Sequence, residues 1–551
     1  MKTGIIQFNP TIGDVEGNTN KILKEYERLS NTDAELIAAQ ELSLTGYPPR
    51  DLLHRPAFID AVETAIAELA AATTDGPPLV VGAPLRTDQT QGPPLNNGVV
   101  VLRNGTQTDT YAKRLLPTYD VFDERRYFDP GLETTIIEVN DTEVGITICE
   151  DAWNDVEVTG QQRHTADPLL ETSQRGADVI LTISASPFSV NKPYRREQRF
   201  IDHAAETGCP VVFVTQVGGN DELVFDGHSL IATKNGITHR FSGFTEHTGV
   251  VEIPDHDTQT IPRYDKPTQE QIRETLTLGI EDYFTKTGFT EAVIGLSGGI
   301  DSSVCAGLAV DALGSENVYG VSLPAAVTDP DNTSDAETVA NALGIEFDVI
   351  PIAESVGEVT GALSEHADRP SGVAYENIQA RIRGDVLMAI ANQRDALVLT
   401  PDNKSEAAVG YCTLYGDTVG GIAPLGDCYK HVVYALAESL NITPPENTTE
   451  RIIPQRIVEK QPTAELRDGQ TDTDDLPPYD VLDDVLKEYI EQTTPVSEMQ
   501  STHDVDTVQE VVDSVSTVEF KRRQTPTPLR ITQKALGRGW QYPVAADYDS
   551  I

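Results

Sequence analysis

The first half of the chain alternates short apolar runs with amphipathic stretches of helical period. Apolar runs of strand length occur at 3–10, 34–41, 78–84, 176–186 and 209–219. Between them, 18–30 and 58–72 repeat apolar residues every three or four positions, as one face of a helix does. The runs near 180 and 210 are apolar throughout, which is typical of strands buried on both faces. The pattern predicts a layered α/β domain of about 250 residues.

A proline-rich polar segment separates this region from a second series of strands and helices. "IPDHDTQTIPRYDKPTQ" (253–269) has no apolar period, and we expect domains at 1–255 and 270–551 with a linker at 256–269. The segments at 291–314, 317–325, 335–352 and 394–406 then form a second series of strands, loops and helices. Strands that alternate with helices predict a doubly wound parallel sheet, whose ligands bind at the carboxyl ends of its strands.

Charge and cysteine content narrow the functional classes. The 551 residues carry a formal net charge of −46, spread along the chain, which disfavours nucleic-acid and membrane partners and fits a halophilic protein. The five cysteines have no CxxC spacing, which argues against a disulfide framework or a zinc site. No apolar stretch reaches the ~18 residues of a membrane span, and the N-terminus has no signal-peptide core. We therefore expect a cytoplasmic protein.

"GLSGGIDSS" (295–303) lies between an apolar strand and an apolar helix. Its small residues leave backbone N–H groups open at a helix N-terminus, which suits a phosphate, and Asp301 is placed to hold Mg²⁺. The alternative is a glycine-rich turn that only caps a helix. The segment lacks the Gly-Lys-Ser/Thr of a Walker A loop and is not a GxGxxG fingerprint.

The SGGxDS pattern resembles the ATP pyrophosphatases, which cleave ATP to AMP and pyrophosphate while adenylating an acceptor. Four further segments, at 375–388, 403–417, 464–479 and 520–528, resemble the NAD⁺ synthetase branch of that group. The resemblance implies a Rossmann-like fold of the adenine nucleotide alpha hydrolase type. It also implies Mg²⁺ at Asp301 and Glu406, and contacts to deamido-NAD⁺ from Asn377, Glu406 and Lys521. The implied ATP-binding residues are Gly295, Leu296, Ser297, Gly298, Gly299, Ile300, Asp301, Ser302, Thr400 and Pro401.

One tetrapeptide departs from the family pattern, and one group of basic residues agrees with it. Where the family reads Thr-Gly-Asn-Lys, this chain has Pro401-Asp402-Asn403-Lys404, so Thr400 is the expected replacement for the ATP-contacting threonine. Basic side chains are scarce here, and those near the matched segments are expected to bind the two anionic nucleotides. They are Arg381, Arg383, Lys404, Lys521, Arg522 and Arg523.

"EVGITICEDAW" (143–153) ends an apolar run with Cys149, which by itself is more often a packing residue than a nucleophile. Glu41 and Lys113 also follow strand-like runs, and residues at strand ends often converge. In their contexts these three resemble the Glu-Lys-Cys triad of the nitrilase superfamily, in the branch fused to NAD⁺ synthetase. The resemblance implies an α-β-β-α sandwich in which Cys149 is the nucleophile, Glu41 the base and acid, and Lys113 the oxyanion stabiliser. Glutamine contacts are then expected at Tyr119, Glu124, Ser186 and Lys192.

Together the two resemblances predict an ATP-dependent ligase that amidates deamido-NAD⁺ with ammonia from glutamine. Ammonia is mostly protonated in water, so we expect it to pass inside the protein. The family also implies a homo-oligomer. The alternatives are a GMP or asparagine synthetase and a non-catalytic sensor. Asparagine synthetases use an N-terminal catalytic cysteine, whereas position 2 here is Lys2. GMP synthetases carry a Cys-His-Glu glutaminase, and the sequence shows no such pattern. The sensor is favoured only by Pro401 and Asp402.

Overall fold

The computed structural model describes most of the chain in seven ranges, which are 1–87, 92–153, 165–254, 258–366, 368–449, 451–467 and 469–547. The chain divides into Met1–Lys266, here unit 1, and Pro267–Ile551, here unit 2. The expected linker at 256–269 spans this division, and its first two residues lie outside the described ranges.

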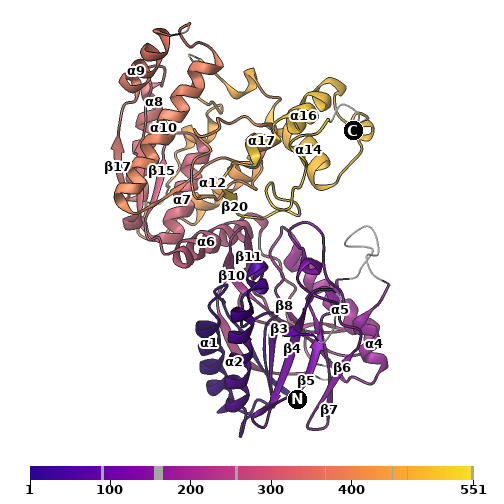
Figure 1. Cartoon of the computed structure of the whole chain (residues 1–551). Helices are drawn as coiled ribbons and strands as arrows, with labels where there is room; N and C mark the ends of the chain where they lie inside the picture. Colours follow the sequence, from indigo (N-terminus) through magenta and orange to yellow (C-terminus); the bar gives the residue numbers. More distant parts are fainter. Residues whose placement is uncertain are drawn as a thin grey trace. The chain divides into compact units, whose positions relative to one another are not determined.

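Unit 1 contains two six-stranded sheets with parallel strands at their centres (Figure 1). The first has the order β14 (His247–Glu252), β1 (Lys2–Gln7), β2 (Leu36–Ala39), β3 (Leu79–Arg86), β4 (Leu95–Arg103), β5 (Thr106–Ala112). The second has the order β13 (Gly236–Arg240), β12 (Leu230–Thr233), β9 (Val211–Thr215), β8 (Val179–Ser184), β7 (Thr142–Ile148), β6 (Thr135–Val139). β1, β2 and β3 are parallel, as are β7, β8 and β9. A separate hairpin joins β10 (Val217–Asn220) to β11 (Leu223–Asp226).

Side chains alternate between two faces of each strand, and at the centres of both sheets both faces are buried. Val80 and Val99 of the first sheet pack with Ile146 and Leu181 of the second in one core between the sheets. Their outer faces are covered by α1 (Val15–Ser30) and α2 (Pro56–Ala72) on one side and by α4 (Pro168–Gln174) and α5 (Lys192–Thr207) on the other. This confirms the predicted α-β-β-α sandwich and explains why its strands read as continuous apolar runs.

Unit 2 has one parallel six-stranded sheet. Its order is β17 (Glu346–Val349), β16 (Val318–Ser322), β15 (Ala292–Gly295), β18 (Leu397–Leu399), β19 (Ile422–Ala423), β20 (Thr527–Pro528). The chain starts in the middle at β15, adds strands on one side and then crosses to the other. The predicted doubly wound sheet is therefore confirmed, and its switch point lies between β15 and β18, where ligands bind in such folds.

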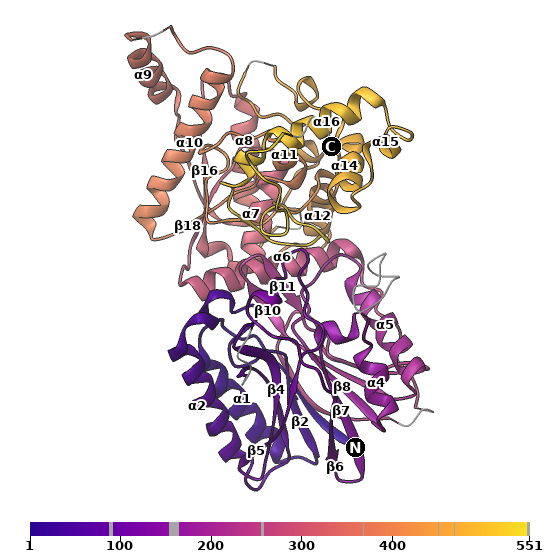
Figure 2. The same cartoon turned by 45° about the vertical axis from the view of Figure 1, so that its right-hand side comes forward.

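Helices of unit 2 cover this sheet and extend beyond it (Figure 2). α10 (Val373–Arg394) and α9 (Ala353–Ser364) pack on one face. A second cluster joins α11 (Lys404–Val409), α14 (Tyr479–Leu486) and α16 (Val505–Thr517). The other helices are α6 (Thr268–Thr287), α7 (Ile300–Leu313), α8 (Pro330–Leu343), α12 (Lys430–Ile442), α13 (Gln455–Glu459), α15 (Val496–Met499) and α17 (Glu519–Arg522). Among the helices described, none is long and apolar enough to cross a membrane.

Phe213→Ala is expected to weaken unit 1. The Phe213 side chain is fully buried on β9, and its ring centroid lies 4.5 Å from that of Phe200 on α5. Removing a buried phenylalanine costs about 3–5 kcal/mol because a cavity remains. Calorimetry should show a lower midpoint for the transition of unit 1. Leu132→Ala, at a side chain 79% exposed, should leave that midpoint in place. Equal midpoints for the two variants would contradict the packing described for α5.

Candidate active sites

Strand ends in unit 1 bring Glu41, Lys113 and Cys149 together. Glu41 lies two residues beyond β2, Lys113 directly follows β5, and Cys149 directly follows β7. The Lys113 Nζ is 2.8 Å from Glu41 Oε1, and both charges act on the pKa of the Cys149 thiol. The structure therefore unites three residues that are far apart in the sequence.

Glu124 completes the surroundings of the Lys113 ammonium. Its Oε1 lies 2.7 Å from Lys113 Nζ, and the lysine is only 1% exposed. Burial lowers the pKa of Lys113, but the carboxylates of Glu124 and Glu41 raise it well above its ordinary value. Burial raises the pKa of Glu124 to about 7, against the effect of Lys113. Lys113 is thus a permanent cation between two carboxyl groups.

Neighbouring groups fix both carboxyl groups. Asn97 on β4 donates from Nδ2 to Glu41 Oε1 at 2.7 Å and to Glu124 Oε2 at 3.3 Å. The backbone N–H of Ala185 donates to Glu41 Oε2 at 2.8 Å, and the Tyr47 hydroxyl donates to Glu124 Oε1 at 2.9 Å. Asn97 was not predicted from the sequence, although a polar residue inside a strand buried on both faces is a usable signal.

The backbone at Cys149 is strained and its thiol is kept protonated. Cys149 has a φ of +42°, a region that costs about 1–3 kcal/mol for a residue other than glycine. Burial raises the pKa of the thiol, the charge of Glu41 raises it further, and Lys113 and the Ser184 hydroxyl lower it. A nucleophilic attack by Cys149 therefore needs a base to take its proton, and Glu41 is the carboxylate whose charge acts most strongly on the thiol.

The expected glutamine-binding residues lie on segments that flank Cys149. The Tyr119 hydroxyl donates to Glu150 Oε2 at 2.9 Å, and Glu150 is the next residue after Cys149. Ser186 lies two residues beyond β8, and its hydroxyl is buried without a hydrogen-bond partner among the described residues. Lys192 begins α5, and its Nζ lies 5.6 Å from the ring centroid of Trp153.

In unit 2, a cavity of about 250 Å³ opens at the switch point of the sheet. The end of β15, the loop that follows it and the first turn of α7 line this cavity with Gly295, Leu296, Ser297, Gly299, Ile300, Asp301 and Ser302. Gly298, also predicted here, lies outside the lining that the described residues form. It shapes the loop instead, because its φ is +82° and a Cβ atom would lie 2.2 Å from the carbonyl oxygen of Asn332. The cavity combines open backbone with a helix N-terminus, which suits a phosphate.

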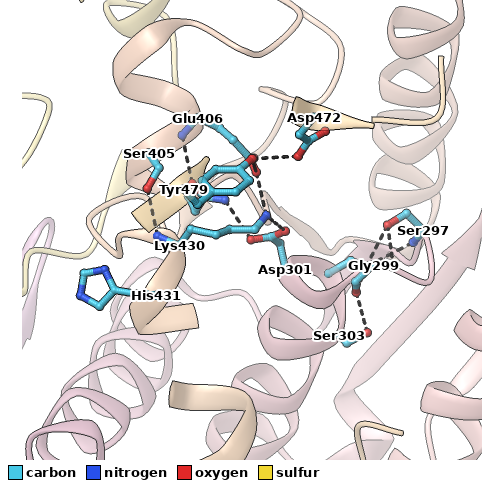
Figure 3. A network of polar contacts seen from close by, with 12 residues as sticks. Ser297, Gly299, Asp301, Ser303, Ser405, Glu406, Lys430, His431, Asp472 and Tyr479 are labelled. Atoms are coloured by element: carbon cyan, nitrogen blue, oxygen red, sulfur yellow. Dashed lines mark hydrogen bonds and ion pairs between the residues drawn. The ribbon is translucent and has the colours of Figure 1, made fainter. Parts of the chain in front are cut away.

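Hydroxyl groups hold this loop in shape (Figure 3). The backbone N–H of Gly299 donates to Ser297 Oγ at 3.2 Å, and that oxygen lies 3.1 Å from Ser302 Oγ. Ser303 Oγ donates to the carbonyl of Gly299 at 2.7 Å. The serine hydroxyls of the motif thus stabilise the conformation of the loop.

Lys430 joins the two carboxylates predicted to bind metal (Figure 3). Its Nζ lies 2.7 Å from Asp301 Oδ2 and 2.8 Å from Glu406 Oε1. Asn403 Nδ2 donates to the other oxygen of Asp301 at 2.9 Å. Lys430 was not predicted from the sequence, but a lysine at the first position of a helix is unfavourable with the helix dipole, and this indicates another role for the side chain.

Tyr479 connects Glu406 to Asp472. Its hydroxyl lies 2.9 Å from Glu406 Oε1 and 2.8 Å from Asp472 Oδ2. One hydroxyl donates one proton, so only one of these carboxyl groups receives it at a time. Burial raises the pKa of Glu406 to about 7, Lys430 lowers it, and the charges of Asp301 and Asp472 raise it.

The residues around this cavity fit Mg²⁺. Asp402 lines the cavity, and its Oδ2 is buried without a hydrogen-bond partner in the described part of the chain. With Asp301 and Glu406 it supplies carboxylate oxygen, the donor that Mg²⁺ takes. The described residues form no preassembled cluster of three or more His, Cys, Asp or Glu. Phosphate and water oxygens would therefore complete the coordination.

Pro401 lines the cavity as expected, whereas Thr400 does not among the residues described. The Thr400 hydroxyl donates to the carbonyl of Val419 at 2.6 Å, and its backbone N–H donates to the carbonyl of Ile422 at 3.0 Å. Thr400 therefore holds β18 against the neighbouring segment.

Asn377 and Lys521 are also absent from the described residues that line the cavity. They contact a loop that does line the cavity. Asn377 Oδ1 accepts a bond from the Thr413 hydroxyl at 2.8 Å. Lys521 Nζ donates to the carbonyls of Gly410 and Cys412 at 2.7 and 2.8 Å. The loop from 410 to 417 supplies Tyr411, Gly416 and Asp417 to the cavity.

The expectation that all six basic residues bind nucleotide is wrong for two of them. Lys404 is fully buried, and its Nζ lies 2.9 Å from Asp427 Oδ1 and 3.1 Å from Glu491 Oε1. Arg522 is buried against Glu519 at 2.9 Å. These cations neutralise internal carboxylates, whereas Arg383 does line the cavity.

Comparisons with known proteins match each unit and the whole chain. The family model described as carbon-nitrogen hydrolase matches residues 2–263, and the one described as NAD synthase matches residues 272–525. The chain is 39% identical to the glutamine-dependent NAD(+) synthetase of Synechocystis over 98% of both chains, and 39% identical to that of Aquifex aeolicus over the same shares.

A solved structure agrees over the same length. The glutamine-dependent NAD⁺ synthetase of Acinetobacter baumannii, solved in complex with ADP, matches at a TM-score of 0.75 and 34% identity, with 98% of each chain covered. Full-length identity of this order is found between members of one family. The chain belongs to the family of glutamine-dependent NAD⁺ synthetases.

Proposed function

We propose that this chain makes NAD⁺ from deamido-NAD⁺, ATP and glutamine, with AMP, pyrophosphate and glutamate as by-products. The observation that carries the proposal is the Glu41-Lys113 pair beside Cys149 in a chain whose other unit holds the glycine-rich cavity. Glutamine hydrolysis supplies ammonia, and adenylation makes the nicotinate carboxyl reactive toward it. Passage of ammonia within the protein would keep it unprotonated.

In the proposed glutaminase reaction, Glu41 takes the proton of the Cys149 thiol as sulfur attacks the side-chain amide carbon. Lys113 stabilises the oxyanion, and the C–N bond breaks as Glu41 passes the proton to the departing ammonia. Water then attacks the thioester, which releases glutamate and restores the thiol. Glu124 keeps Lys113 charged and in place.

Glutamine binding is assigned to side chains around the thiol. Tyr119, Glu124, Ser186 and Lys192 are the proposed contacts. The support is their position on segments that flank Cys149, together with the buried hydroxyl of Ser186, which has no hydrogen-bond partner in the part of the chain that the structure describes. An unpaired buried hydroxyl is costly, and a bound amide would satisfy it.

In the proposed synthetase reaction, ATP binds in the cavity, with its phosphates at the loop from Gly295 to Ser302 and at Pro401. Asp301 and Glu406 would hold Mg²⁺, which neutralises charge on the phosphate oxygens. Lys430 lies between these carboxylates and adds a second cation beside the phosphates. Deamido-NAD⁺ is assigned to Asn377, Glu406 and Lys521, the first and last of which support the 410–417 loop.

Three further proposals concern the setting of the enzyme. The net charge of −46 supports adaptation to high salt, which screens self-repulsion. Five free cysteines support a reducing compartment, as in the cytoplasm. Exposed apolar side chains on α9 and α10 support a homo-oligomer; they are Val359, Leu363, Val373 and Met388.

Substitution of one residue in each unit tests the two half reactions. Cys149→Ala should lose glutamine-driven NAD⁺ synthesis by at least about 1,000-fold and keep synthesis from ammonium, because only the nitrogen donor is lost. Asp301→Ala should lose both, because ATP chemistry requires the phosphate site. NAD⁺ formation in high salt with each nitrogen source is the measurement. Retained glutamine use by Cys149→Ala would refute the nucleophile assignment.

Gly298→Ala should reduce synthesis by about 100-fold or more with either nitrogen source. The added Cβ meets the Asn332 carbonyl and strains a backbone with φ of +82°, so the loop shifts away from the phosphates. Gly361→Ala is the matched control, since nothing lies within 4 Å of its added Cβ. Steady-state rates of the two variants are compared with the parent enzyme. A normal rate for Gly298→Ala would show that the loop is not used.

Mg²⁺ affinity in the presence of an ATP analogue should rise as the pH rises through about 7. Burial raises the pKa of Glu406 to about 7, and its proton must leave before the oxygen binds metal. Below that pH the affinity should fall by up to about tenfold per unit. Calorimetric titration should show a flatter profile for Glu406→Gln. Glu465→Gln should keep the profile, because that cavity residue also has a pKa of about 7 but faces Lys460 and Arg383.

A further inference from the structure

Asp151 carries a buried carboxylate that the reactions above do not use. It is only 2% exposed. Its Oδ1 accepts hydrogen bonds from the backbone N–H groups of Arg114 and Leu115, at 3.1 and 3.0 Å. These residues directly follow Lys113, so the carboxylate holds the chain where it leaves the lysine.

The second oxygen of the same carboxylate holds the turn of the nucleophile. Asp151 Oδ2 accepts a hydrogen bond from the backbone N–H of Ile148 at 2.9 Å. The bond closes a short turn around Cys149, which lies between these two residues and has a φ of +42°. A strained backbone of this kind persists only when contacts with the surrounding structure hold it in place. Asp151 supplies that constraint.

The fourth partner of this carboxylate is a side-chain hydroxyl rather than a backbone N–H. The Tyr111 hydroxyl donates to Asp151 Oδ2 at 2.7 Å. Tyr111 is buried on β5, in the core between the sheets. Three backbone donors and one hydroxyl give the buried anion a full set of partners, which lowers the cost of burying its charge.

We propose that Asp151 is a positioning residue for glutamine hydrolysis. One carboxylate ties the strand end that carries Lys113 to the turn that carries Cys149, so the ammonium and the sulfur keep a fixed spacing. A change of about 1 Å in such a spacing can cost about 100-fold in rate. The inference rests on the proposed role of Cys149 as the nucleophile.

Asp151→Asn in the full chain is the main test. The asparagine amide keeps one oxygen acceptor, but its NH₂ group replaces the other oxygen. The hydrogen bonds to one of the two backbone segments are therefore lost. We expect kcat with glutamine to fall by about 100-fold, with KM within about threefold and ammonium-driven synthesis unchanged. The rate of Cys149 alkylation by iodoacetamide, followed by mass spectrometry, should fall as well. A role in overall stability alone would not produce this division between kcat and KM.

Two more variants separate geometry from charge and folding. Asp151→Glu keeps the charge but displaces both oxygens, and it should also lose kcat. Tyr111→Phe removes only the hydroxyl partner and keeps the three backbone donors that tie the two segments together, so its kcat should stay within about fivefold of the parent. Near-ultraviolet circular dichroism checks the fold of each variant.

The results distinguish a failure of the positioning role of Asp151 from a failure of the nucleophile role of Cys149. Normal kcat in Asp151→Asn or Asp151→Glu would overturn the positioning role while leaving Cys149 as the nucleophile. Equal losses with glutamine and with ammonium would also overturn it. If Cys149→Ala retained glutamine use, the proposed glutaminase function itself would fail.

Discussion

A buried lysine ammonium held between two carboxyl groups is the interaction on which both sites depend. In unit 1, Lys113 lies 2.8 Å from Glu41 and 2.7 Å from Glu124, and Lys430 is held in the same way in unit 2. Moving such an ion out of water costs several kcal/mol, which only close and well-directed partners offset. The lysine therefore fixes the carboxyl groups as firmly as they fix it.

The same arrangement limits what each lysine can do electrostatically. The charge of Lys113 is balanced by two carboxyl groups, so it does not suffice to turn the Cys149 thiol into a thiolate. Activation must then come from proton transfer to Glu41 at the moment of attack, which protects the thiol between turnovers. In unit 2, carboxyl groups outnumber cations among the described residues that line the cavity, which favours entry of an anionic nucleotide together with a cation of its own.

The features that could be predicted from the sequence are those that strand periodicity determines, namely the strands and the residues that closely follow them. The doubly wound sheet of unit 2 and a layered α/β unit 1 followed from apolar periods and connections, whereas the α-β-β-α sandwich was implied by a family resemblance. Glu41, Lys113 and Cys149 each follow a strand, which allowed their convergence to be proposed. Lys430 was missed because its role depends on which carboxylates surround it, and that is a property of tertiary packing. Lys404 was wrongly placed for the same reason: a basic residue in a matched motif can serve a buried ion pair as well as a ligand.

The departure at Pro401 and Asp402 shows how burial alters the meaning of a charged residue. From sequence, Asp402 adds a negative charge where ATP should bind. In the structure, burial and the charges of Asp417, Glu406 and Asp301 raise its pKa well above the ordinary value, which favours the neutral acid. A carboxyl group whose charge is suppressed in this way repels a phosphate less, and a cation bound beside it would favour its charged form again. Pro401 lacks a backbone N–H, so at this position the cavity wall offers a phosphate no backbone donor, and the neighbouring carboxyl matters through its charge rather than through its place in the motif.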